Sequence, residues 1–278
     1  MSKVQIVTGG TSGMGLATAE KVAKYGPVVI VGRNEKRMEN ALGKLRAAGV
    51  DAHGVPADVS DRASLSNVVE GAQKIGEVQN VVHAAAVAGE KDTDAIIKID
   101  VMGTINVVET FLPFMKEGCA MALYSSTTGR MFQPSAEQLE VWAKPNDPDF
   151  VKKFKETLPD SLGVDKGEAA RLPKGYIAYF AAKNFVMYYT RANAARFGAR
   201  GARIFSIAPG SFATPMLNPD PEFRKMTSAQ TALGRIGDPD EMASLFAALL
   251  DPSVGYLTGT DVLMDGGMFA KQFTPQLP

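Results

Sequence analysis

Two side chains four residues apart, Tyr179 and Lys183, form the pair in this sequence that is best suited to chemistry. On a helix, this spacing places both residues on one face, with their β-carbons roughly 5–6 Å apart. The ammonium of Lys183 is therefore expected to stabilise a phenolate and to lower the tyrosine pKa from about 10 towards neutrality. A tyrosine of this kind can exchange a proton with an alcohol or carbonyl oxygen. The alternative for Tyr179 is a buried aromatic whose hydroxyl is merely hydrogen-bonded.

A glycine-rich stretch from Thr8 to Gly15 follows the first apolar run and opens a helical pattern. Gly9 would permit a tight turn, Gly13 a close approach of the backbone to phosphate, and Gly15 close packing of helix on strand. The first amides of the helix could hold a pyrophosphate, although a plain strand-to-helix turn is the alternative. We expect cofactor contacts from Gly9, Thr11, Ser12, Gly13, Met14 and Gly15.

The second apolar run ends in Val31-Gly32-Arg33-Asn34, where a site that prefers NAD would usually carry a carboxylate. The guanidinium of Arg33 instead suits bidentate contact with a 2′-phosphate. NADP(H) is thus favoured, while Glu35 nearby keeps NAD(H) possible, and Arg33 could also be a solvated loop residue. After the third run, Asp58 and Val59 are expected at the cofactor, with Asp58 accepting from the adenine amino group or capping the next helix.

The composition is that of a soluble globular protein, with 278 residues, 45% hydrophobic content, and 30 basic against 30 acidic side chains. This balance gives no support to nucleic-acid binding or to attachment at an anionic membrane. The sequence shows neither a long apolar stretch nor a secretory signal, so a cytoplasmic location is expected. Cys119 is the only cysteine, and His53 and His83 are the only histidines, so neither an internal disulfide nor a metal site is expected.

Short β-rich apolar runs alternate with amphipathic helical segments along the chain, as is typical of a parallel sheet covered on both faces. The expected strands are Val4–Val7, Val28–Val31, Gly54–Ala57, Val78–Val82, Met121–Tyr124, Ile204–Ile207 and Val262–Met264. The expected helices include Leu16–Tyr25, Glu35–Ala48, Leu65–Ile75 and Asp238–Leu250. Such doubly wound sheets bind ligands outside the carboxyl ends of their strands, so functional residues should follow strands directly.

Further motifs occupy such positions in a fixed order. After the glycine pattern and Asp58 come Ser125-Ser126, Tyr179-Phe180-Ala181-Ala182-Lys183, Pro209-Gly210 with Thr214, and Asp265-Gly266-Gly267. This ordered set spans nearly the whole chain and resembles the short-chain dehydrogenase/reductase family. The resemblance implies a single Rossmann-like doubly wound α/β domain over residues 1–278, with about seven parallel strands and helices on both faces. It also implies hydride transfer between a nicotinamide and a carbonyl or alcohol.

The resemblance assigns roles to residues that match the family motifs. Tyr179 would be the acid/base, Lys183 would lower its pKa and bind the nicotinamide ribose, and Ser126 would hold the substrate oxygen. Pro209, Gly210 and Thr214 would line the nicotinamide. Independently of the family, a serine and a tyrosine hydroxyl are suitable donors to charge that develops on a substrate oxygen.

Two positions depart from the family pattern. His83-Ala84-Ala85-Ala86 stands where Asn-Asn-Ala-Gly is usual. Ala84 and Ala85 are still small enough for the cofactor to approach, and His83 is interpreted as a structural residue rather than a catalyst. Asp100 stands where members commonly have an asparagine that anchors a water in the proton relay. When ionised, Asp100 accepts hydrogen bonds but cannot donate them, which puts a relay through this candidate catalytic residue in doubt.

An insertion of roughly Met131 to Gly175 separates Ser126 from Tyr179 and resembles one in some bacterial 3α-hydroxysteroid dehydrogenases/carbonyl reductases. Its apolar side chains fit short amphipathic helices. They would either form a wall for a bulky substrate or pack the insertion or a subunit interface. These residues are Phe132, Trp142, Phe150, Phe154, Leu158 and Leu162. The segment Pro215–Gly234, rich in prolines, is expected to be a loop that closes over ligand or simply lies on the surface.

The sequence therefore favours an NAD(P)(H)-dependent oxidoreductase that interconverts a hydrophobic secondary alcohol and a ketone, with a steroid-like substrate as one candidate. The family resemblance also implies a homodimer or homotetramer. Epimerases and dehydratases with the same Tyr-x-x-x-Lys pair are a weaker alternative, because only 95 residues follow Lys183. A catalytically silent dinucleotide-binding sensor is the alternative from another class.

Overall fold

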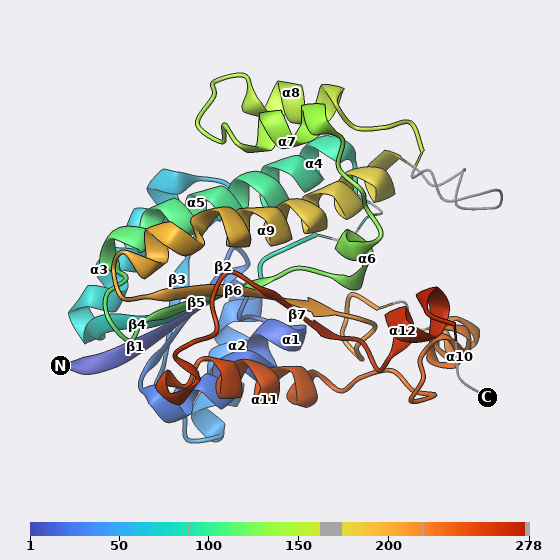
Figure 1. Ribbon diagram of the computed structural model, residues 1–278. Helices are drawn as coiled ribbons and strands as arrows, with labels where there is room; N and C mark the ends of the chain where they lie inside the picture. Colours follow the sequence, from blue (N-terminus) through green and yellow to red (C-terminus); the bar gives the residue numbers. More distant parts are fainter. Residues whose placement is uncertain (88, 90, 162–173, 218–219, 276–278) are drawn as a thin grey trace.

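The structure is a computed structural model that describes residues 1–87, 89, 91–161, 174–217 and 220–275. Seven parallel strands form one sheet in the order β3-β2-β1-β4-β5-β6-β7, shown in Figure 1. The strands are β1 (Ser2–Thr8), β2 (Val28–Gly32), β3 (Ala52–Pro56), β4 (Gly76–His83), β5 (Ala120–Tyr124), β6 (Arg203–Pro209) and β7 (Asp261–Met264). The predicted seven-stranded doubly wound fold is confirmed, and the strand order reverses between β1 and β4.

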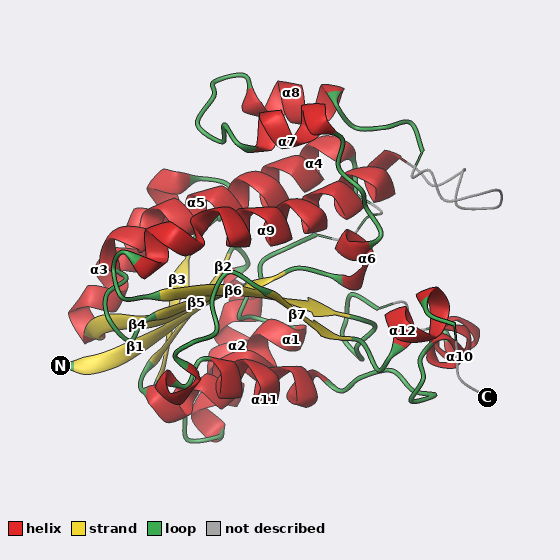
Figure 2. Cartoon of the chain, viewed as in Figure 1, coloured by secondary structure: helices red, strands yellow, loops and turns green. Residues whose placement is uncertain are grey.

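Helices cover both faces of the sheet, as Figure 2 shows. On one face lie α1 (Gly13–Val22), α2 (Glu35–Ala47) and α11 (Pro239–Leu249), and on the other α3 (Arg62–Ile75), α5 (Gly103–Phe111) and α9 (Lys174–Gly198). Shorter elements are η1 (Ala23–Tyr25), α4 (Thr93–Ile96), η2 (Ile97–Met102), η3 (Leu112–Phe114), α6 (Thr127–Arg130), α7 (Ala136–Trp142), α8 (Phe150–Glu156), α10 (Pro221–Gln230), η5 (Pro252–Val254) and α12 (Met268–Phe273). Among the described residues, no helix is both long and apolar enough to span a membrane.

The apolar strand runs form the core because both faces of the sheet are covered. The last five residues of β1 and all of β5 and β6 are buried. One apolar layer joins the sheet to α3, α5 and α9, and a second joins it to α1, α2 and α11. The core therefore fixes the carboxyl ends of the strands, where the predicted functional residues lie.

The inserted segment packs on the outside of the helical layer, where α7 and α8 lie beside α4 and α9 in Figure 1. Trp142 of α7 is 1% exposed, and its ring centroid lies 5.6 Å from that of Phe185 and 5.7 Å from those of Phe154 and Tyr188. Phe132, Phe150 and Phe154 are buried in the same cluster, and Leu158 packs against it. These contacts favour the packing interpretation over the substrate wall. Leu162 and the rest of 162–173 lie outside the described residues.

The prediction that Pro215–Gly234 lacks regular structure was wrong for its central part. Helix α10 begins at Pro221, a position where proline is favourable because the first helical amide needs no intrahelical partner. Asp220 caps this helix by accepting a hydrogen bond from the amide of Glu222 at 3.1 Å. Pro219 lies outside the described residues. The predicted capped helix after Asp238 is confirmed as α11, with a capping box between Asp238 and Glu241.

Candidate active site

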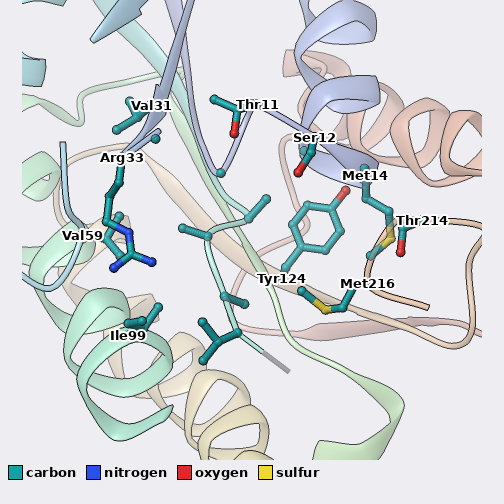
Figure 3. A pocket seen from close by; sticks show the side chains of 18 of the residues that line it. Thr11, Ser12, Met14, Val31, Arg33, Val59, Ile99, Tyr124, Thr214 and Met216 are labelled. Carbon is teal, nitrogen blue, oxygen red and sulfur yellow. The ribbon is translucent and has the colours of Figure 1, made fainter. Parts of the chain in front are cut away.

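A cavity of about 300 Å³ lies at the carboxyl ends of the strands, where the strand order reverses. Figure 3 shows Arg33 beside Val59 and Ile99 towards one end, and Tyr124, Met14, Thr214 and Met216 towards the other. Most of the predicted cofactor contacts line this cavity. They are Gly9, Thr11, Ser12, Gly13, Met14, Gly15, Arg33, Asp58, Val59, Ala84, Ala85, Tyr179, Lys183, Pro209 and Thr214.

The start of α1 offers free donors to an anion. Ser12 occupies the position before the helix but makes no capping hydrogen bond, and the first turn carries no acidic side chain, within the described part of the chain. The first amides of a helix and its dipole favour a negative charge. Gly15 packs so tightly that an added β-carbon would lie 2.3 Å from the carbonyl oxygen of Gly9. The residues present therefore fit a bound pyrophosphate.

Cationic and hydrogen-bonding groups gather where β2 and β3 end. Arg33 lies with Nη1 3.4 Å from Oδ2 of Asp58, and its side chain is 61% exposed. Burial raises the pKa of Asp58, but hydrogen bonds from Ser60 and the charge of Arg33 outweigh burial and lower it below the usual value. Arg37, in the first turn of α2, lines the same end of the cavity. Two arginines thus line this end of the cavity.

Tyr179 and Lys183 lie together on α9, as their spacing predicts. The Nζ atom of Lys183 is 5.4 Å from the centroid of the Tyr179 ring. The same Nζ lies 3.1 Å from Oδ2 of Asp100, and this ion pair is almost fully buried. Oδ1 of Asp100 accepts a hydrogen bond from the amide of Val87 at 2.9 Å. Asp100 belongs to the π-helical segment η2, a type of irregularity that is frequent at functional sites.

The predicted net lowering of the Tyr179 pKa is not what the structure gives. Burial raises the pKa of Tyr179 above its usual value of about 10; Lys183 lowers it, Asp100 raises it, and a hydrogen bond with Ser126 lowers it. Lys183 thus acts in the predicted direction, but burial and the carboxylate of Asp100 outweigh it. The sequence argument counted the cation and missed the anion that faces it.

Ser126 caps the short helix α6 and is 8% exposed. Its Oγ accepts hydrogen bonds from the amide of Thr128 at 3.3 Å and from the Thr128 hydroxyl at 2.9 Å. Both Thr128 groups donate, so the Ser126 proton is free to be donated to another oxygen. Ser126 is also close enough to Tyr179 to lower the pKa of its phenol.

Asp261 of β7 ties the turn that carries Ser126 to two strands. Its Oδ1 accepts from the hydroxyls of Ser125 at 2.5 Å and Ser206 at 2.6 Å. Its Oδ2 lies 2.6 Å from Nη2 of Arg130, and the Asp261 side chain is only 5% exposed. Ser125 precedes Ser126 and Arg130 ends α6, so Asp261 holds both sides of the turn.

Two other titratable groups near the cavity are unsuited to proton transfer. His83 Nδ1 lies 2.7 Å from the Thr8 hydroxyl, and burial, aided by the charge of Lys183, lowers its pKa to about 3. His83 is therefore neutral, in keeping with the structural role predicted for it. Burial raises the pKa of Tyr124, whose hydroxyl pairs with that of Thr18 at 2.9 Å. Tyr124 therefore keeps its proton.

Ser126, Asp100 and Gly210 are not among the residues that line the cavity. Ser126 interacts with Tyr179 and Asp100 pairs with Lys183, whereas Gly210 packs against Asp265, where a β-carbon would lie 2.8 Å away. Sequence reasoning missed Arg37 and Tyr124, whereas Met216 belongs to the segment Pro215–Gly234 that was expected to shape the substrate pocket. Tyr124 ends β5 and Arg37 lies in the first turn of α2, so the rule that sites follow strand ends could have found them.

Comparisons with known proteins agree with this architecture. The family model described as short chain dehydrogenase matches residues 3–137, and the model described as enoyl-(acyl carrier protein) reductase matches residues 163–269. A 2,5-dichloro-2,5-cyclohexadiene-1,4-diol dehydrogenase of Sphingobium indicum is 28% identical over 95% of each chain. A 3-oxoacyl-[acyl-carrier-protein] reductase of Thermotoga maritima is 27% identical over 96% of this chain and 97% of its own.

Solved structures match over the same extent. A dehydrogenase/reductase from Sinorhizobium meliloti has a TM-score of 0.75 at 20% identity, covering 96% of this chain and 94% of its own. At this level of identity the likeness concerns the fold alone. With matches to family models along most of its length, this chain belongs to the short-chain dehydrogenase/reductase family and is an oxidoreductase.

Proposed function

We propose that this protein is an NADP(H)-dependent oxidoreductase that interconverts a secondary alcohol and a ketone, with Tyr179 as the acid/base. The observation that carries the proposal is that Tyr179 and Lys183 line one cavity together, with Ser126 next to the Tyr179 phenol. Pro209 and Thr214 line the same cavity and would contact the nicotinamide, with Gly210 shaping the turn between them.

When bound, the nicotinamide would supply or accept the hydride. Ser126, whose oxygen accepts from Thr128, would donate to the substrate oxygen and position it. Tyr179 would give its proton to that oxygen during reduction of a ketone and take it back during oxidation of an alcohol. Lys183 would hold the nicotinamide ribose and limit the negative charge on the phenolate.

The chain's own residues support a choice of NADP(H). The amides at the start of α1 would hold the pyrophosphate, and Arg33 and Arg37 would face a 2′-phosphate. Asp58, whose carboxyl stays ionised, would accept from the adenine amino group. Val59, Ala84 and Ala85 would contact the rest of the nucleotide.

The substrate would be a bulky hydrophobic alcohol or ketone, with a steroid-like molecule as one candidate. Met14 and Met216 line the cavity near Thr214, and Met216 is 53% exposed. Flexible methionine side chains adapt to irregular apolar ligands. The relative named as a dehydrogenase of a cyclic chlorinated diol is consistent with a ring-bearing substrate.

We also propose a homodimer or homotetramer, as the family resemblance implies. Strand β7 lies at an edge of the sheet, and Tyr256, which precedes it, is fully exposed. An exposed edge with an aromatic side chain is suited to a subunit contact. Light scattering coupled to size-exclusion chromatography would measure the oligomer, and a monomer at all concentrations would contradict this part of the proposal.

Tyr179→Phe tests the proposed chemistry because it removes the exchangeable proton and keeps the ring. We expect a loss of turnover of at least about 10²-fold with cofactor affinity nearly unchanged. The measurement is NADPH oxidation across a panel of ketones, with cofactor binding by calorimetry. Tyr188→Phe is the matched control, since Tyr188 packs against Trp142 and should retain activity.

Turnover preserved in Tyr179→Phe would reject the role of Tyr179. Tight nucleotide binding by the wild-type protein without turnover of any alcohol, ketone or aldehyde would instead favour a silent sensor.

A further inference from the structure

The buried carboxylate of Asp100 lies beside the Lys183 ammonium, whose positive charge stabilises the phenolate of a tyrosine acid/base. The Asp100 and Lys183 side chains are 0% and 5% exposed, and their charged atoms lie 3.1 Å apart. Oδ1 of Asp100 accepts from the amide of Val87, whereas Oδ2 has the Lys183 ammonium as its partner in the described part of the chain. Burial raises the pKa of Asp100 and the charge of Lys183 opposes this rise, so the ammonium is the main compensation for that oxygen.

Lys183 is shared between this carboxylate and the Tyr179 ring, whose centroid lies 5.4 Å from its Nζ. In a site of low effective dielectric, a neighbouring cation favours the phenolate and a neighbouring anion opposes it. A lysine paired with a carboxylate presents little net charge to the phenol. The phenolate is then stabilised far less than it would be by an unpaired lysine.

The other groups around the phenol do not restore the missing positive charge. Ser126 of α6 contributes a neutral hydroxyl, and His83 of β4, close enough to feel the charge of Lys183, is itself neutral. Asp100 of η2 and Lys183 of α9 are the charged groups that act on Tyr179 among the described residues. Burial raises the pKa of Tyr179 most, and the balance between these two charges determines how far that rise is opposed.

We propose that the Asp100–Lys183 ion pair biases this site towards carbonyl reduction by keeping Tyr179 in its proton-donating form at neutral pH. Asp100 is thus a positioning residue that acts on the pKa of Tyr179 indirectly, through its ion pair with Lys183. The inference rests on the proposed function and names the direction in which the site works best.

The proton balance of the two directions explains this bias. In reduction, the carbonyl carbon gains a hydride from the reduced nicotinamide, the carbonyl oxygen takes the Tyr179 proton, and the phenolate recovers a proton from solvent. In oxidation, the phenolate must first exist, because it takes the alcohol proton as the hydride leaves. Burial and then Asp100 raise the pKa of Tyr179, so the form needed for reduction is the one present near neutrality.

The first test titrates Tyr179 directly in the protein without cofactor. Ultraviolet difference spectra follow tyrosinate formation from the seven tyrosines, and subtraction of the Tyr179→Phe spectrum isolates the signal of Tyr179. We expect Asp100→Asn to move this titration to lower pH by about one unit or more, because the opposing carboxylate charge is gone. An unmoved titration would overturn the inference.

The second test compares pH profiles of kcat for both directions. In Asp100→Asn, the rise of alcohol oxidation and the fall of ketone reduction should both move to lower pH by the same amount. A uniform loss of activity without such a shift would mean that Asp100 has only a structural role. Asp94→Asn is the matched control, since the exposed Asp94 of α4 also pairs with a lysine, Lys155, and its loss should leave the profile unchanged.

Asp100→Ser provides a second variant if the asparagine disturbs packing, and thermal unfolding together with nucleotide binding shows that each variant is folded. The outcomes separate the two proposals. Turnover retained in Tyr179→Phe sinks the proposed function itself. If Tyr179→Phe is inactive but the pH profile of kcat does not move in Asp100→Asn, only the role of the ion pair is rejected.

Discussion

Single residues in this site owe their chemistry to neighbours that lie far away in the sequence. The spacing of Tyr179 and Lys183 predicts that they share a helix face, and the structure confirms this contact. The effect of Asp100 could not be predicted, because Asp100 and Lys183 are brought together only when η2 packs beside α9. A charge that lies 83 positions upstream is invisible to a periodicity argument; only the departure from the family asparagine drew attention to it.

At the same scale, Arg33 carries the choice of nucleotide. Arg33→Asp should shift the preference, measured as the ratio of kcat/KM for NADPH to that for NADH, towards NADH by at least about tenfold, because a carboxylate repels a 2′-phosphate and accepts from ribose hydroxyls. Lys36→Asp, an equal change of charge at an exposed position of α2 that does not line the cavity, is the control. If both variants leave the ratio unchanged, Arg33 does not read the phosphate.

At the scale of elements, strand ends made the site predictable. Apolar runs located all seven strands, and the residues that directly follow β1, β2 and β3 line the cavity. Helix α10 was missed because its proline was interpreted as ending regular structure. Pro221 occupies the first turn, where proline favours the start of a helix. The π-helical turn of η2 has no sequence signature of its own, so the position of Asp100 within it could not be foreseen.

The link between β7 and the turn before α6 gives an element-scale prediction. Asp261→Asn should lower the free energy of unfolding by about 2–4 kcal/mol, because Arg130 loses its buried partner. It should also lower kcat more than it raises KM for the cofactor, because Ser126 lies between Ser125 and α6. Chemical denaturation and steady-state kinetics measure the two effects.

Asp265 would be an unsuitable comparison because it shapes the turn beside Gly210, so Asp240→Asn, at an exposed position in the first turn of α11, serves as the control for the Asp261 variant. A stable Asp261→Asn protein with normal kcat would show that the serine turn does not depend on β7.

At the scale of the whole molecule, the insertion adds a further layer of helices outside the two helical layers that cover the sheet. Its helices α7 and α8 cover α9, and their aromatic residues contact Phe185 and Tyr188 rather than the cavity. The sequence predicted its place and its helical character. It could not decide between wall and packing, because both need the same apolar side chains.

Trp142→Ala should therefore reduce the free energy of unfolding by about 3–5 kcal/mol while leaving KM for large and small substrates in the same ratio. Denaturation followed by circular dichroism measures the first effect and a substrate series the second. Val151→Ala, at a 41% exposed position of α8, should cost less than about 1 kcal/mol. A selective loss of bulky substrates in the Trp142 variant would restore the wall interpretation.

Helix α9 joins these observations, since Tyr179 and Lys183 precede Phe185 and Tyr188 on the same 25-residue helix. Trp142 is the only indole of the chain, so its fluorescence comes from the inserted layer and not from the nucleotide cavity. A change of emission on addition of cofactor would then report strain transmitted along α9. The fluorescence of Trp142 therefore measures whether cofactor binding changes the packing between α9 and the inserted helices.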